Sequence, residues 1–188
     1  IIIFGEKHGT KEIPEMLTQF FVYITKEYAF NVGLEIPIEF QDKINQFIKE
    51  GKKIILRDVN FFSKENCPDG RNSLEYIRLM QKIHEINLTS NEKIRVFCID
   101  SLANSQDEKE RNMADKVLEL SKEKRIFVVM GSIHASKNIV NIRGIQIIPS
   151  GYLIFNKVKE KMFNLWLVSK DERVGKEEYI FNKGFDYV

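Results

Sequence analysis

Short apolar runs alternate with longer stretches of mixed polar and apolar residues along this chain. The runs that predict β-strands cover residues 1–5, 31–36, 94–100, 125–131 and 145–148. This alternation is typical of an α/β fold with a mainly parallel central β-sheet and helices on both faces. Later apolar runs at 162–169 and 178–182 predict edge strands, for which an antiparallel direction is allowed.

The intervening stretches carry apolar residues at helical spacing. A helix over about 11–30 is predicted by one such face, made of Ile13, Leu17, Phe20, Phe21, Ile24 and Tyr28. Further helices are expected over 38–50, from Ser73 to about Asn87, and after Ser105. Thr10 is a candidate cap for the first helix, and Ser105 with Glu108 forms a capping-box pattern before the last.

Composition limits the classes of protein that fit this pattern. A length of 188 residues with 43% hydrophobic content favours a single α/β domain over 1–188. The net charge of +2 and the interspersed charges argue against nucleic-acid binding. No apolar run reaches the roughly 18 residues that a membrane-spanning helix needs, and no signal-peptide pattern is present. A cytoplasmic location is therefore favoured unless a leader was removed, while the oligomeric state is left open.

Two strand-like runs end in the same Gly-x-x-His pattern. Gly5 precedes His8 near the start of the chain, and Gly131 precedes His134 far along it. Ten glycines and three histidines in 188 residues predict only about 0.16 such patterns by chance. The pair therefore indicates a shared site more strongly than either copy alone.

Acidic residues follow the predicted strands as the histidines do. Glu6, Glu35 and Asp100 stand at or near the ends of three apolar runs. Because the carboxyl ends of parallel strands open onto one crevice, we expect these carboxylates and the two histidines to meet there. Buried acids and imidazoles are costly unless they are paired or used. Glu6 and His8 are two residues apart, so in an extended chain they share a face and a carboxylate can orient the imidazole.

Two arginines are candidates for binding a substrate. Arg71 in "DGRNS" and Arg111 in "KERNMA" each lie near the predicted start of a helix. A guanidinium there can bind a carboxylate or phosphate, or stabilise a developing oxyanion, and Asp100 can join it in contacting substrate. Salt bridges to Glu35 or Asp100 are the competing interpretation of both arginines. His84 lies on a predicted apolar helix face and is interpreted as a core or boundary residue.

These motifs together resemble the superfamily of erythromycin esterase-type hydrolases, TIKI/TraB-type proteins and haem-binding ChaN-type lipoproteins. The resemblance covers about residues 1–150 and rests on five segments: Gly5 to His8, Glu35 in "GLEIP", Asp69-Gly70-Arg71, Arg111-Asn112-Met113-Ala114, and Gly131 to His134. It implies an EreA/ChaN-like α/β fold. Esterase-like relatives imply water activation by His and Glu, TIKI-like relatives a metal-dependent peptidase, and ChaN-like relatives haem binding without established catalysis.

Two classes of function follow from the sequence. The first is a hydrolase of an ester, lactone or amide bond in a small-molecule or peptide substrate, with Glu6, His8, Glu35 and His134 as catalytic residues. In a metal-dependent variant, His8, His134 and Glu6 would bind a divalent ion and activate its water. The second is a non-catalytic protein that binds haem or another small acidic ligand, for which Tyr152, Tyr179 and Tyr187 are candidate contacts.

Overall fold

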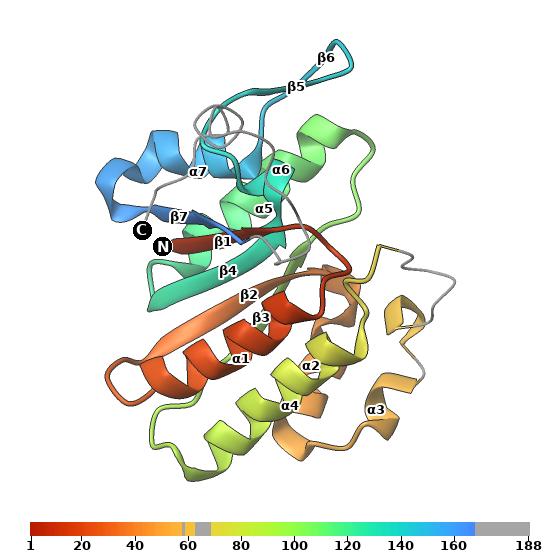
Figure 1. The fold of residues 1–188 in the computed structure, drawn as a ribbon, viewed down its shortest axis with the longest axis vertical. Helices are drawn as coiled ribbons and strands as arrows, with labels where there is room; N and C mark the ends of the chain where they lie inside the picture. The colour runs from red at the N-terminus through yellow and green to blue at the C-terminus, as the bar shows by residue number, and fades with distance from the viewer. Residues whose placement is uncertain (58, 63–68, 168–188) are drawn as a thin grey trace.

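A five-stranded, all-parallel β-sheet forms the centre of the molecule (Figure 1). The computed structural model describes residues 1–57, 59–62 and 69–167. The strands are β1 (Ile2–Glu6), β2 (Phe30–Pro37), β3 (Val96–Asp100), β4 (Arg125–Gly131) and β7 (Phe163–Trp166). Their order across the sheet is β3-β2-β4-β1-β7, and every neighbouring pair is parallel. The predicted α/β fold is therefore confirmed.

Helices cover both faces of this sheet (Figure 1). One face is packed by α1 (Glu12–Ile24), α2 (Gln41–Glu50) and α4 (Leu74–Thr89), and the other by α5 (Gln106–Leu120) and α7 (Ser150–Val158). The short helices are α3 (Ile54–Arg57), α6 (Ser132–Ala135), η1 (Ile38–Phe40), η2 (Asn60–Phe62) and η3 (Lys159–Lys161). None of the helices in the described ranges is long and apolar enough to cross a membrane.

The strand order places the carboxyl ends of β2, β4 and β1 side by side. After β1 the chain forms β2 two positions away in the sheet and then β3 at the outer edge. It next returns to form β4 between β2 and β1, and finally β7 beyond β1, and the helices of this second half cover the opposite face. In open α/β sheets ligands bind at the carboxyl edge where the strand order reverses in this way. Here β4 lies between β1 and β2, so the ends of these three strands form that edge.

Several predicted boundaries need correction. The first helix ends at Ile24 rather than near residue 30, because the polar residues that follow close tight turns in which Lys26 and Glu27 donate to Tyr23 and Ile24. Lys11, not Thr10, is its N-cap, and the Thr10 hydroxyl donates to the Lys7 carbonyl instead.

The C-terminal part differs more from the sequence prediction. The run at 145–148 contributes β6 (Ile145–Ile147), which pairs with β5 (Val140–Ile142) in a separate antiparallel hairpin outside the main sheet. The run at 162–169 supplies β7 as an edge strand, and it is parallel to β1 rather than antiparallel. Helix α7 connects them and was not predicted. The run at 178–182 lies outside the described residues.

Two side-chain amides cover the outer edge of strand β3. Gln41 accepts from the Cys98 N–H (2.8 Å) and donates to the Val96 carbonyl (2.9 Å). Asn87 bonds both backbone groups of Ile94, each at 2.8 Å. An exposed strand edge is a template for pairing with other chains, so these amides replace a neighbouring strand at this edge.

Replacing Gln41 with alanine is expected to lower the free energy of unfolding by about 1–3 kcal/mol, because the buried Cys98 N–H loses its acceptor. Urea unfolding measures this effect, and light scattering after mild heating should show faster aggregation. Gln46→Ala is the control, because Gln46 is exposed on the same helix and bonds the exposed Glu50 side chain. Equal stability of the two variants would contradict the proposed role of Gln41.

Candidate functional site

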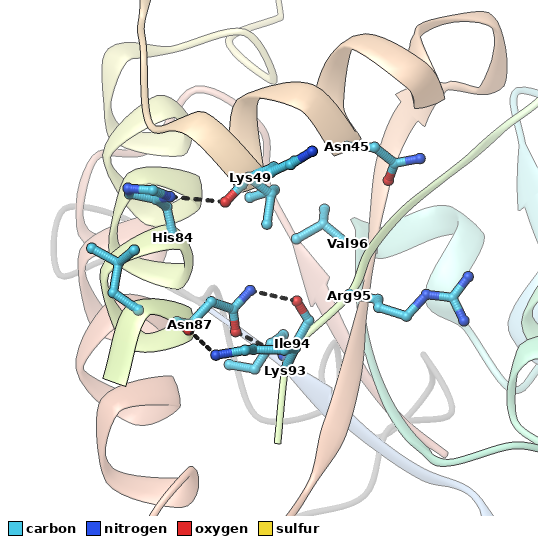
Figure 2. Close-up of a pocket in the computed structure, with 10 residues that line it drawn as sticks. Asn45, Lys49, His84, Asn87, Lys93, Ile94, Arg95 and Val96 are labelled. Carbon is cyan, nitrogen blue, oxygen red and sulfur yellow. Dashed lines mark hydrogen bonds between the residues drawn. The ribbon is translucent and has the colours of Figure 1, made fainter. Parts of the chain in front are cut away.

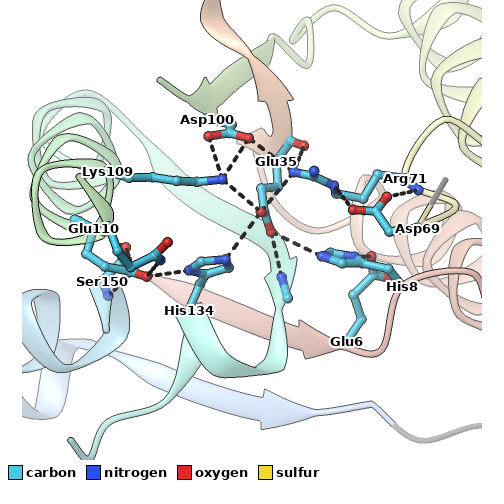
Figure 3. A network of polar contacts seen from close by, with 12 residues as sticks. Glu6, His8, Glu35, Asp69, Arg71, Asp100, Lys109, Glu110, His134 and Ser150 are labelled. Carbon is cyan, nitrogen blue, oxygen red and sulfur yellow. Dashed lines mark hydrogen bonds and ion pairs between the residues drawn. The ribbon is translucent and has the colours of Figure 1, made fainter. Parts of the chain in front are cut away.

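The carboxylate of Glu35 lies at the centre of a polar network at the carboxyl edge of the sheet (Figure 3). A register irregularity between β2 and β3 spans Leu34 to Pro37, and such bulges redirect side chains near the ends of strands. One oxygen, Oε2, accepts the Gly131 backbone N–H at 2.7 Å, and Oε1 accepts from Arg71 at 2.9 Å. The side chain is only 4% exposed, so its charge is stabilised by these donors rather than by water.

Both predicted histidines face this carboxylate. The Nε2 atoms of His8 and His134 lie 3.5 Å from Oε2 and Oε1 of Glu35, respectively. His8 follows β1, and His134 lies in α6 directly after β4, although the two are far apart in sequence. The two Gly-x-x-His motifs thus bring their histidines to the same carboxylate at this edge of the sheet.

The Nδ1 atom of each imidazole hydrogen-bonds a buried carboxylate on the side of the ring away from Glu35. His8 Nδ1 lies 2.9 Å from Glu6, and His134 Nδ1 lies 2.6 Å from Glu110. Because a carboxylate accepts, each Nδ1 carries the proton, and Nε2 is the atom turned toward Glu35. Glu110 is fixed in turn by the backbone N–H and hydroxyl of Ser150, at 2.8 and 2.7 Å. The site therefore contains two carboxylate-imidazole pairs around a third carboxylate.

The absence of a side chain at Gly131 leaves room for the His8 ring. A Cβ atom added at Gly131 would lie 2.8 Å from His8 Nε2 and 3.4 Å from His134 Cδ2. The second Gly-x-x-His motif therefore needs its glycine partly to accommodate the histidine of the first.

Replacing Gly131 with alanine is expected to displace the His8 ring while leaving the fold intact, because the new methyl group meets the movable end of a side chain. The ¹H–¹⁵N spectrum of the imidazole should change at His8, with a loss of stability of about 1–3 kcal/mol. Gly144→Ala is the matched control, since nothing lies within 4 Å of a Cβ there, although its positive φ adds some strain. An unchanged His8 resonance in Gly131→Ala would rule out this steric account.

The Arg71 loop is positioned by contact between two glycines. Gly9 and Gly70 both have positive φ, and a Cβ at Gly70 would lie 2.4 Å from the Gly9 Cα atom. This close approach brings the loop beside the His8 segment. Arg71 then pairs with Asp69 (2.9 Å) and Asp100 (3.1 Å) in addition to Glu35.

These contacts place Arg71 and Asp100 in an internal salt-bridge network. Asp100 also binds Lys109 on α5 at 2.9 Å, and the Lys109 ammonium lies 3.8 Å from Glu35. This is the salt-bridge interpretation that competed with substrate binding for Arg71. Contact of Arg71 or Asp100 with a substrate stays a prediction, whereas the ion pairs of Arg71 with Glu35 and of Asp100 with Arg71 and Lys109 are observed.

The network shifts the pKa values of its members. Burial lowers the pKa of His8, but hydrogen bonding to Glu35 and Glu6 and their negative charges outweigh it and raise that pKa to about 9. The pKa of His134 is raised by Glu110 and Glu35 against burial and against the opposing charge of Lys109. The pKa of Glu35 is lowered far below its usual range, because His8, His134 and Arg71 overcome its burial. At neutral pH the site thus holds an ionised Glu35 and a protonated His8.

One predicted residue lies away from this cluster. Arg111 is exposed on α5, and within the described ranges no contact links it to Glu35 or Asp100. Its neighbours Lys109 and Glu110 take part instead, and neither was predicted. A sequence signal for Glu110 existed, because it shares the apolar face of α5 with Met113 and Val117 and a charge on such a face needs a partner.

The donor set does not suit the metal site suggested by the sequence. Glu6 lies on the Nδ1 side of His8, whereas the Nε2 atoms point to Glu35, so His8, His134 and Glu6 do not converge on one point. Glu35 is already bonded to Arg71 and lies near Lys109, and these cations compete with a metal ion for its oxygens. Across the described part of the chain, no group of three histidine, cysteine or acidic residues has a metal-binding arrangement.

Haem does not fit inside this network either. The cavity beside Glu35, Arg71 and Tyr76 has a volume of about 10 Å³, which is room for one water molecule. Haem could therefore contact His8 or His134 only from the outer surface, where their side chains are 19% and 17% exposed. Tyr152 is half-buried on α7, and Tyr179 and Tyr187 lie outside the described residues.

Comparison with known proteins shows the fold and leaves the family open. No protein-family model and no curated protein sequence matches the chain. A succinoglycan biosynthesis protein has a similar structure over 87% of this chain and 64% of its own, with a TM-score of 0.67 and 12% identity. A Bacillus cereus protein matches over 87% of this chain and 65% of its own, with a TM-score of 0.57 and 11% identity. The chain thus spans under two thirds of each of these neighbours.

A haem-binding protein is also among the structural neighbours. The structure of ChaN from Campylobacter jejuni, described as having cofacial haem bound, matches over 91% of this chain and 82% of its own, with a TM-score of 0.52 and 16% identity. The chain has a ChaN-like fold. At such low identity this likeness concerns the fold alone.

Proposed function

We propose that this chain hydrolyses an ester, lactone or amide bond of a small molecule or peptide, with His134 as the general base that activates water. The observation that carries the proposal is the pair of imidazoles that face Glu35, each anchored at Nδ1 by a buried carboxylate. A carboxylate behind an imidazole fixes its tautomer and stabilises the imidazolium formed during proton transfer. Such a pair is what a base acting on water requires.

The two histidines have different roles in this proposal. His8 has a pKa of about 9, so at neutral pH it is charged and can donate a proton to the leaving group or stabilise an oxyanion. At His134, Glu110 and Glu35 also raise the pKa, against burial and the opposing charge of Lys109, so the base is the fraction of His134 rings that has lost the Nε2 proton. Glu35 holds the rings in place, and Arg71 and Lys109 balance its charge.

Hydrolysis of 4-nitrophenyl acetate, a simple lactone and a dipeptide amide tests the proposal. His134→Ala and Glu110→Gln are each expected to reduce kcat/KM about 100-fold or more for the accepted substrate. His84→Gln is the matched control, because His84 is the remaining histidine of the chain and bonds the Ile48 carbonyl elsewhere in the fold. If purified protein hydrolyses none of these compounds, or if His134→Ala retains the activity, the proposal fails.

The ChaN-like fold motivates haem binding as the second candidate. Titration with haemin would then give a Soret band at micromolar concentration that is lost in His8→Ala or Tyr152→Phe. Such a band in a protein without hydrolytic activity would replace the hydrolase proposal, whereas no spectral change would remove the haem candidate.

A further inference from the structure

A second cavity lies at the opposite edge of the sheet from the Glu35 network. Its volume is about 340 Å³, within the range of small-molecule sites. It lies between α2, α4 and the segment that enters β3 (Figure 2). Its apolar wall includes Ile48, Leu88, Ile94 and Val96, and none of the described residues that line it is acidic.

Val96, at the outer edge of β3, lines this cavity and carries a backbone N–H that points away from β2. Val32 of β2 donates to the Arg95 carbonyl at 2.9 Å, so in the parallel register the N–H of Val96 points away from β2. The Gln41 side chain hydrogen-bonds the Val96 carbonyl and the Cys98 N–H, and the Asn87 side chain hydrogen-bonds the N–H and the carbonyl of Ile94. Among the residues that the structure describes, none accepts from the Val96 N–H. Such a buried donor is costly unless something accepts from it.

Two side chains of α2 add donors on the same side. Asn45 and Lys49 are four residues apart and share one helix face above Val96 (Figure 2). The bonds of Gln41 to β3 fix its amide orientation, and its Nε2 donates to Asn45 Oδ1 at 2.9 Å, so the NH₂ group of Asn45 is available. Lys49 is exposed and forms no ion pair with any described residue.

The other basic groups at this cavity are already used. The Lys93 ammonium binds the carbonyls of Asn87 and Ser90 at the end of α4. Arg95 projects to the other face of the sheet, where it packs on Phe97 and pairs with Glu123. His84 Nδ1 bonds the Ile48 carbonyl. The donors left for a ligand are thus Val96 N–H, Asn45 and Lys49.

We propose that this cavity binds a small amphipathic carboxylate. Its acid group would accept from Val96 N–H, Asn45 and Lys49, and its apolar chain would lie against Ile48, Leu88 and Ile94. Charge-assisted hydrogen bonds to a carboxylate are the strongest contacts this donor set can form, and the apolar wall favours a ligand with an apolar chain over a fully polar ion such as free phosphate. This inference is independent of the hydrolase proposal, because it uses different residues at the opposite edge of the sheet.

Titration of ¹⁵N-labelled full-length protein with sodium octanoate tests the proposal. The Val96 amide resonance is expected to shift downfield with saturation, and octanol, which has the same chain and no charge, is expected to bind about tenfold more weakly. Lys49→Met should weaken octanoate binding on the order of tenfold, whereas Lys43→Met, an exposed lysine of α2 outside the cavity, should leave it unchanged.

Three results would overturn this assignment. The Val96 resonance could stay unmoved by octanoate, octanol could bind as tightly, or Lys49→Met could bind octanoate as well as Lys43→Met does. Because Lys49 is exposed, its replacement is compatible with folding, and the spectrum of the variant verifies this directly.

Discussion

Replacing Glu35 with glutamine is expected to lower the free energy of unfolding by about 3–5 kcal/mol, because it removes the buried negative charge that Arg71 and the two imidazoles share. The carboxylate bonds Arg71 and has both imidazoles within 3.5 Å. Glutamine has nearly the same shape but replaces one acceptor oxygen with an NH₂ group, so the loss reports the missing charge and acceptor rather than a cavity. Urea unfolding at pH 7, followed by circular dichroism, measures it.

The control for this variant is Glu15→Gln, which removes an exposed carboxylate that pairs with Lys11 on the surface of α1. It should change the free energy of unfolding by less than about 0.5 kcal/mol. A second readout is the His8 pKa, which NMR titration should find lower in Glu35→Gln, because Glu35 contributes to raising it. If stability and the His8 pKa both stay at wild-type values, Glu35 is not the centre of this network.

The position of the site was predictable because it depends on topology. In a parallel sheet every strand ends at the same edge, so apolar runs that end in His8, Glu35 and His134 must bring these residues near one another. The partner of His8 was also predictable, since Glu6 lies two residues before it and shares its face. These inferences need only strand direction and the alternation of side chains.

The partner of His134 could not be found by local spacing. Glu110 comes from α5 and reaches His134 across 24 residues of sequence. The motif resemblance pointed to Arg111, the next residue, yet a shift of one position on a helix turns a side chain by about 100°. Here Arg111 faces solvent while Glu110 is fully buried. The apolar period of α5 was the better guide, because it places Glu110 on the inward face.

The order of elements after residue 131 was the least predictable part of the fold. The run at 145–148 is a strand, but Asn141 and the positive-φ pair Arg143 and Gly144 turn it back on β5 in a hairpin. Helix α7 then carries the chain to β7, at the far edge of the sheet. A short apolar run predicts a strand but not which strand it pairs with. Only the assembled sheet therefore distinguishes a hairpin strand from a central strand.

The ionised network should also confine maximum stability to mildly acidic pH. The pKa of His8 is raised from 6.5 to about 9, so its contribution of about 3 kcal/mol is complete below pH 6.5 and is lost as pH rises toward 9. The pKa of His134 is raised too, which adds loss in the same direction. The pKa values of Glu35 and Glu110 are lowered, so their contribution is present above about pH 4.5 and is lost on acidification. We therefore expect a maximum at about pH 5–6.

Urea unfolding at several pH values between 4 and 9 measures this profile. His8→Gln should flatten the decline between about pH 6.5 and 9, because its side chain has no proton to lose there. His84→Gln should keep the wild-type slope, since the His84 ring lies outside the network. Equal stability of the wild-type protein at pH 9 and at pH 6 would mean that Glu6 and Glu35 do not hold the His8 imidazole in its charged form. That result would also contradict the acid role proposed for His8.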